Sequence, residues 1–347
     1  MDRRHVGGTE RLTPFMAANR KLHDSQMVFL GYRAYLNEQE KRFYDELRAG
    51  LSVRKKRFDI RKADKTVFDQ GLNLVQLDLP ELYEVDSVVY EFSTSNPFIT
   101  VIPTYRPSGG SAERTAIETQ RKKIVSLITE KTDWERMLKL HDILCRNITY
   151  RNIGPDAHSI VGPLLRRASV CEGIAKTVKH ICDALKIPCY VVTGTARSSI
   201  DERGNGPHAW NKVLLAGQWV NIDVTFDLTI SKEKLIRHDY FAVPDKVISR
   251  DHSEDRKTHP CTARNVDYYS RRGLIMRDLN IVFEEVKRHL CLGGNCSFEF
   301  RFPYDINGIE QSNILDSLKR AYEACRKSGS CSISFNPETR SCLLKLS

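Results

Sequence analysis

No stretch of this 347-residue sequence comes close to the roughly 18 consecutive apolar residues that a membrane-spanning helix requires. The first residues, Met1 to His5, are polar and no apolar segment follows them, so we expect no signal peptide. The sequence also contains no internal repeat and no low-complexity tract. Together these absences predict a globular, cytoplasmic protein without a membrane span.

The motifs of common nucleic-acid and metal-binding modules are missing as well. The sequence contains no zinc-finger spacing, no RNP-type aromatic motif and no heptad zipper. A calcium loop of the D-x-D-x-D-G type is also absent. We therefore expect neither a bound metal nor another cofactor.

Ten cysteines are present, but none forms a C-x-x-C pair. In a reducing compartment most of them should be small buried side chains rather than metal ligands or disulfides. If the protein were exported, disulfides among the five cysteines from Cys291 to Cys342 would be the better interpretation.

The formal net charge is +10, and much of it lies near the N-terminus. Residues 1–70 hold 16 Lys and Arg against 10 Asp and Glu, a local excess of +6. The densest cluster is Arg54-Lys55-Lys56-Arg57. Such a cluster could meet phosphate, a membrane surface or an acidic protein, or it could be the solvated end of a helix. Without an accompanying motif we favour the helix end and do not expect a nucleic-acid partner.

Length and a hydrophobic content of 41% predict two or three domains with sizeable cores. We expect an N-terminal α+β domain over residues 1–110 with a flexible lead-in, a catalytic domain over 111–252, and a connector with a small α+β domain over 253–347. The linker Pro107-Ser108-Gly109-Gly110-Ser111 marks the first boundary. Periodicity predicts helices over residues 37–49, 113–129, from 133, 276–290 and 313–327. It predicts extended segments over residues 72–79, 87–92, 98–105, 148–151, 297–302, 330–336 and 341–346.

One cysteine is set apart by its position. Ser169 and Glu172 form an S-x-x-E capping box before an apolar-periodic run, which makes Ser169 the expected N-cap and places Cys171 at the second helical position. Unpaired N–H groups and the helix dipole stabilise a thiolate there, as a nucleophile requires. Gly173 leaves space for another chain or a substrate to approach. On position alone, we favour a structural role for Cys171 over a catalytic one, and the case for a nucleophile depends on its partners.

A nucleophilic cysteine needs a base and an orienting group. His180 points away from Cys171 on the same predicted helix, which leaves His208. Residues 208–215 and 219–226 read as two strands joined at Ala216-Gly217, with cross-strand pairs whose numbers sum to 433. His208 then faces Thr225, and Asp223 lies one diagonal step away on the same face. Asp227 lies on the same predicted strand face, further along, and is the second choice as the orienting group.

The motifs Val170-Cys171-Glu172-Gly173, His208-Ala209-Trp210-Asn211 and Trp219-Val220-Asn221-Ile222-Asp223-Val224-Thr225 resemble the transglutaminase-like superfamily, in particular its bacterial members. The resemblance extends over about residues 133–252 and includes Asp239-Tyr240-Phe241 and Arg250-Asp251-His252. The separations of 37 and 15 residues between Cys, His and Asp fit that compact pattern. Phe226, where relatives often carry tryptophan, affects the expected cleft wall rather than the triad.

The resemblance implies an α+β protein with a papain-like cysteine-enzyme core and a Cys171, His208 and Asp223 catalytic triad. It implies acyl transfer from a peptide or protein substrate, with water as acceptor in a peptidase or amidase and an amine in a transglutaminase. We favour hydrolysis, and a non-catalytic binding or scaffold protein on the same fold is the alternative from another class. The backbone N–H of Cys171 is the expected oxyanion donor, with Tyr150 or His158 as candidates for a second.

Overall fold

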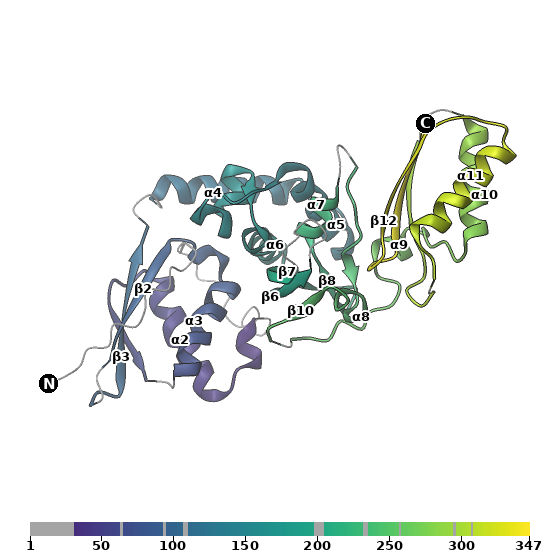
Figure 1. Ribbon diagram of the computed structural model, residues 1–347. Coiled ribbons are helices and arrows are strands. Elements are labelled where there is room, and N and C mark those ends of the chain that lie inside the picture. Colours follow the sequence, from purple (N-terminus) through teal and green to yellow (C-terminus); the bar gives the residue numbers. More distant parts are fainter. Residues whose placement is uncertain are drawn as a thin grey trace.

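The computed structural model describes residues 31–347 except 63–64, 93–94, 107–109, 198–204, 232–234, 257, 294–295 and 307. Most of the predicted lead-in and the core of the predicted linker lie outside these residues. The described chain is a mixed helix and sheet structure, in which three antiparallel sheets follow one another from the N-terminal to the C-terminal side (Figure 1). The expected α+β class is therefore confirmed. Within the described part, no helix has the length and apolar content to cross a membrane.

The N-terminal part pairs two helices with a three-stranded sheet of order β1-β3-β2. Asn37 caps α2 in a capping box with Glu40. The elements are α2 (Glu38–Ser52), β1 (Phe58–Arg61), α3 (Lys65–Asp78), β2 (Val85–Phe92) and β3 (Phe98–Tyr105).

The extended segment predicted over residues 72–79 is wrong, because these residues belong almost entirely to α3. Gly71, Leu74, Val75 and Asp78 are all buried, and this i, i+3, i+4, i+7 spacing is that of one helix face. A short apolar run cannot be assigned to strand or helix from periodicity alone. The Asp78 carboxylate accepts a hydrogen bond from the Tyr44 hydroxyl at 2.9 Å, which ties α3 to α2.

The central part is built on a five-stranded antiparallel sheet of order β10-β6-β7-β8-β9. Helix α6 packs against it through an apolar stripe that includes Ile174, Val178 and Ile181. The helices are α4 (Ser111–Ser126), α5 (Asp133–Asn147), α6 (Cys171–Leu185), α7 (Val224–Ile230) and α8 (Asp245–Ile248). The strands are β4 (Thr149–Tyr150), β5 (Ala168–Ser169), β6 (Cys189–Arg197), β7 (Asn205–Leu215), β8 (Gln218–Ile222), β9 (Phe241–Val243) and β10 (His252–Glu254).

The C-terminal part contains α9 (Tyr268–Arg271), α10 (Leu279–Leu292), β11 (Cys296–Arg301), α11 (Gln311–Ala324), β12 (Cys331–Asn336) and β13 (Ser341–Leu346). The predicted order helix, strand, helix, strand, strand is confirmed. Its strands form a sheet of order β11-β13-β12, and α10 and α11 cover the face turned away from the central part (Figure 1). All ten cysteines are free thiols in the structure.

Buried side chains connect the N-terminal part to the central one. A single apolar cluster runs from α2 and the first sheet into the central part, where it includes Ile160, Val161, Ala175 and Val191. The C-terminal part instead has a cluster of its own around Phe300 and Leu344. The domain limits proposed from the sequence stay predictions.

The basic cluster at the end of α2 is partly neutralised by neighbouring acids. Arg54 forms an ion pair with the buried Glu84 at 2.9 Å and lies over the Tyr105 ring. Arg57 pairs with Glu91 at 2.8 Å. The interpretation of this cluster as a solvated helix end stays a prediction.

Candidate active site

Cys171 is the first residue of α6. The helix begins one residue later than predicted, so Cys171 occupies the first helical position and not the second. The N-cap is Val170, which makes no side-chain cap, so the predicted capping box is wrong. Ser169 does not cap the helix because it lies in β5, where its hydroxyl donates to the carbonyl of Ala157 at 2.6 Å. The helix start can still stabilise a Cys171 thiolate, because residues in the first turn present unpaired N–H groups. The thiol is half-buried, whereas Cys182, on the apolar face of the same helix, is fully buried.

The predicted strand register is confirmed. Asn211 pairs with Ile222 and Val213 with Val220, so the paired numbers sum to 433. The second strand is shorter than predicted, however, because β8 ends at Ile222 and residues from Val224 onward form α7.

Asp223 ends the strand by capping the helix that follows. Its Oδ1 accepts the backbone N–H groups of Thr225 at 2.8 Å and Phe226 at 3.0 Å, an N-cap arrangement. Its Oδ2 lies 2.7 Å from Nε2 of His208. The side chains of His208 and Asp223 are 7% and 1% exposed, so this contact is shielded from water.

This environment holds His208 in its charged form. Burial alone would lower the pKa of His208, but the charge and hydrogen bond of Asp223, together with a contact to Cys171, raise it to about 10. For Asp223, burial favours the neutral form, but His208 and then His252 outweigh it and bring the pKa of the carboxyl well below its usual value. Because Nε2 of His208 faces Asp223, its Nδ1 is left for the thiol.

A second histidine, not expected from the sequence as a site residue, also contacts Asp223. Nε2 of His252 lies 3.0 Å from Asp223 Oδ2, and its Nδ1 lies 2.5 Å from Oδ1 of Asp251. The Tyr240 hydroxyl donates to the other Asp251 oxygen. His252 enters the site from β10, which is an edge strand of the sheet and pairs with β6. No local pattern reports such a contact; only the Asp-His dipeptide within the family-like segment pointed to it.

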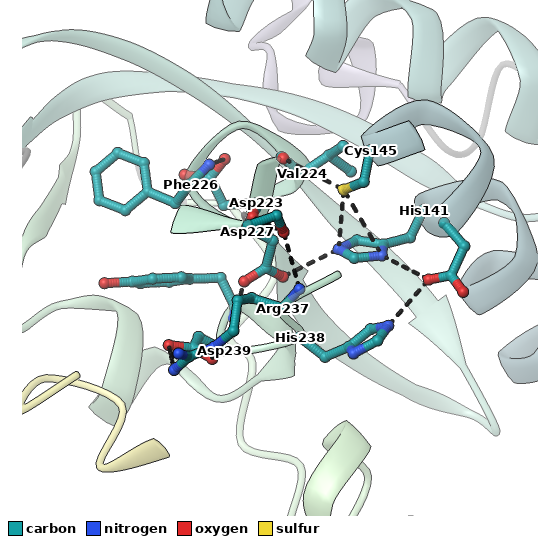
Figure 2. Close-up of polar contacts among 12 residues, drawn as sticks. His141, Cys145, Asp223, Val224, Phe226, Asp227, Arg237, His238 and Asp239 are labelled. Carbon is teal, nitrogen blue, oxygen red and sulfur yellow. Dashed lines mark hydrogen bonds and ion pairs between the residues drawn. The ribbon is translucent and has the colours of Figure 1, made fainter. Parts of the chain in front are cut away.

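Asp227, the second choice as orienting group, faces a different histidine. Its Oδ2 lies 3.0 Å from Nε2 of His141, while its Oδ1 accepts the backbone N–H of Tyr240 at 3.0 Å. Figure 2 shows Cys145 and Asp227 beside His141. Oδ1 of Asp142 joins His141 to His238, at 3.2 and 2.9 Å. Burial raises the pKa of Asp227 to about 6. Asp227 therefore belongs to a buried network that links α5 to α7, not to the His208 contact.

Of the two candidates for a second oxyanion donor, Tyr150 is the one near the thiol. The parallel pairing of β4 and β5 places Tyr150 opposite Ser169, two residues before Cys171. Tyr150 is 46% exposed, but partial desolvation of its hydroxyl, followed by the charges of Cys171 and Asp223 and the hydrogen bond with the Cys171 side chain, raises the pKa of Tyr150 to about 12. Its hydroxyl therefore keeps its proton. The other candidate, His158, contacts Glu172 instead, with its Nδ1 3.0 Å from a carboxylate oxygen of that residue.

Two side-chain groups within the described residues bring potential metal ligands within 4.8 Å of one another. One is His141, Asp142 and His238, and the other is His208, Asp223 and His252. In both, a carboxylate oxygen lies between two imidazole nitrogens at hydrogen-bond distance. Histidine–carboxylate hydrogen bonds are sufficient to account for both arrangements.

Comparison with curated proteins gives a partial match. The Kyphoscoliosis peptidase of Mus musculus is 24% identical over 165 residues, which are 42% of this chain and 25% of that protein. The chain thus spans only about a quarter of the length of this relative.

Comparison with solved structures gives matches at low identity. A TGase crystal structure is 15% identical with a TM-score of 0.30, covering 51% of this chain and 52% of that chain. A candidate cysteine protease from Cytophaga hutchinsonii is 14% identical with a TM-score of 0.30, covering 57% and 65%.

A family model supplies the assignment for the central segment. It matches residues 121–224, a range that contains Cys171, His208 and Asp223, and it describes the transglutaminase-like superfamily. The resemblance seen in the sequence motifs is thereby confirmed: residues 121–224 are a domain of the transglutaminase-like superfamily.

Proposed function

We propose that this protein is a cysteine enzyme that hydrolyses amide bonds of a peptide or protein substrate. Cys171 is the nucleophile, His208 the general base and acid, and Asp223 the group that orients His208. The observation that carries the proposal is the buried 2.7 Å contact between His208 and Asp223, together with the contact of His208 with a half-buried cysteine at a helix start.

The groups suffice for both steps of acyl transfer. The Cys171 thiolate attacks the substrate carbonyl, and the protonated His208 gives its proton to the leaving amine, so that a thioester forms and the amide bond breaks. Neutral His208 then takes a proton from water, and the resulting hydroxide attacks the thioester. This releases the carboxylic acid and returns the proton to the Cys171–His208 pair. The Cys171 N–H and the Tyr150 hydroxyl are the proposed donors to the oxyanion.

Transamidation, with an amine in place of water, uses the same three residues and is the second candidate. We favour water because the mouse relative that covers part of this chain is named a peptidase, and because nothing in the sequence indicates a docking site for lysine. The cytoplasmic location and the peptide or protein substrate stay predictions from the sequence.

Iodoacetamide labelling against pH tests the nucleophile without knowledge of the substrate. An ordinary cysteine is almost entirely a neutral thiol at pH 6 and reacts slowly. The imidazolium of His208 should keep Cys171 reactive at that pH, so mass spectrometry should find it modified before the other nine cysteines. The variant H208Q should remove this selectivity. Equal, slow reaction of all ten thiols would exclude the proposed enzyme and favour a binding protein.

A peptide library incubated with and without a labelled primary amine tests the acceptor. Hydrolysis produces new N-termini whether or not the amine is present, whereas transamidation incorporates the label. The variant C171A, which removes only the thiol, is the control for contaminating activity. Label incorporation that depends on Cys171 would replace hydrolysis by transamidation as the assigned reaction.

A further inference from the structure

His252 contacts the same oxygen of Asp223 as the proposed base, and the rings of the two histidines lie 5.3 Å apart between centroids. Its Nε2 and that of His208 both face Asp223 Oδ2, at 3.0 and 2.7 Å. The His252 side chain is fully buried, and the side chains of Asp223 and Asp251 are 1% and 3% exposed. Water therefore cannot replace any of these contacts at low cost.

The partners of His252 fix its protonation state. Both ring nitrogens face carboxylate oxygens, Asp223 on one side and Asp251 on the other, so both must carry a hydrogen. Asp251 also accepts from the Tyr240 hydroxyl, which leaves it acting as an acceptor. These contacts describe an imidazolium held between two carboxylates.

The groups around His252 come from several elements. Asp223 lies at the end of β8 and Asp251 directly before β10, while the rings of His208 on β7 and Tyr240 before β9 lie 5.3 and 5.7 Å away between centroids. The remaining ring neighbours, Trp210 and Phe226, are uncharged. The nearest charges are therefore two carboxylates and one other imidazolium.

We propose that His252 is a positioning residue of the active site: held as an imidazolium by Asp251, it fixes the Asp223 carboxylate toward His208 and limits how tightly His208 holds its proton. This inference rests on the proposed function, because His252 acts through Asp223 and His208. The second hydrogen bond to Oδ2 fixes the position of the Asp223 carboxylate. The charge of His252 limits the pKa of His208, since a cation beside Asp223 offsets part of the negative field that His208 experiences.

The two effects separate in two variants. H252Q keeps an N–H that can reach Asp223 but removes the charge, so the pKa of His208 should rise by about one unit. H252L removes both the charge and the hydrogen bond, so it should also lower kcat by roughly tenfold or more with little change in KM. D251N, which takes away the carboxylate that keeps His252 charged, should move His208 in the same direction as H252Q by a smaller amount.

Imidazole NMR of histidine-labelled full-length protein provides a readout that needs no substrate. We expect His252 at pH 7.5 to show two protonated ring nitrogens, and H252Q to move the titration of His208 upward. H180Q is the matched control, because His180 is also a buried histidine of the central part but makes no contact with Asp223 in the described structure. Thermal unfolding of each variant checks that it remains folded.

A neutral His252, or a His208 titration equal in wild type and H252Q, would overturn the inference even if Cys171 is reactive at pH 6. If iodoacetamide does not label Cys171 selectively in the wild type, the proposed function is contradicted, whatever the NMR of His252 shows. If H252L lowers stability alone, with normal kcat and an unmoved His208 titration, His252 is merely structural and the inference fails.

Discussion

At the scale of single residues, the two oxygens of Asp223 have different tasks. Oδ1 accepts the N–H groups of the first turn of α7, which fixes the rotation of the carboxylate, and Oδ2 is then directed toward the two histidines. A side chain that ends a strand, caps a helix and contacts His208 has little freedom to move. Small changes in this carboxylate should therefore have large effects on His208.

The variant D223N should abolish most of the activity. An asparagine can still cap α7 through its carbonyl oxygen, but it then directs an NH₂ group at the Nε2–H of His208 and has no charge to hold the imidazolium. We expect kcat to fall by about 10⁴-fold, the size of effect known for an orienting aspartate.

The same variant has a defined pH signature. In the wild type, activity should decline as the pH rises through about 10, where His208 loses its proton. In D223N that decline should begin near the ordinary value of about 6.5. D227N, which alters a carboxylate in contact with His141 instead, should leave the His208 titration in place. An unchanged His208 titration in D223N would contradict the orienting role.

Tyr150 offers a second residue-scale prediction. The variant Y150F keeps the ring and removes only the hydroxyl, which lies near Cys171 and retains its proton. If this hydroxyl donates to the oxyanion, kcat should fall by about 10²-fold with little change in KM. Iodoacetamide labelling of Cys171 should stay selective, because alkylation forms no oxyanion. A Y150F enzyme with normal kcat would leave the second donor unassigned.

At the scale of secondary structure elements, the start of α6 is held by close packing around Gly173. A Cβ placed there would lie 2.3 Å from Oγ of Ser169, 2.4 Å from the carbonyl of Ala157 and 2.8 Å from that of Ser159. Two of these three atoms are backbone and cannot move without shifting the short helical turn Pro155–His158. The absence of a side chain thus determines where the helix, and with it Cys171, begins.

The variant G173A should lower the free energy of unfolding by about 1–3 kcal/mol, the usual cost of overpacking. It should also slow Cys171 alkylation, because the helix start must shift to accept the methyl group. G206A is the control, since a Cβ at Gly206 in β7 meets nothing within 4 Å. Denaturant unfolding of both variants measures the difference. Equal stability of the two would show that the loop before α6 yields easily.

The same elements show what the sequence could and could not specify. Alternation in residues 219–222 defined the register that brings His208 and Asp223 together, because a one-residue slip would expose Val220 and Ile222. The end of β8 was missed because Asp223 caps α7 through backbone N–H groups, and the alternation of side chains along a strand does not reveal such a cap. His252 was missed as a site residue because sheet order, which places β10 beside β6, depends on tertiary packing.

At the scale of the whole molecule, a buried ion pair lies where the C-terminal part meets the central one. The guanidinium of Arg237 donates to both Asp239 oxygens at 2.9 and 2.8 Å and to the carbonyl of Ser334 on β12 at 3.1 Å. Asn336, on the same strand, donates to Asp239 at 3.1 Å. The C-terminal part is thus joined to the segment that carries Tyr240, the hydroxyl partner of Asp251. Loss of this pair should affect the stability of the molecule at the junction.

The variant R237M should destabilise the protein by about 3–5 kcal/mol, because it leaves the Asp239 carboxylate buried without its cation. The double variant R237M/D239N should recover much of this loss, since it removes the stranded charge as well. R197A is the matched control: Arg197 pairs with Glu338 of the C-terminal part at 2.6 Å, but its side chain is 57% exposed, so the loss should stay below about 1 kcal/mol. Chemical unfolding followed by tryptophan fluorescence measures all three variants. A double variant as unstable as R237M would mean that the guanidinium stabilises the junction through Ser334 and packing rather than through charge.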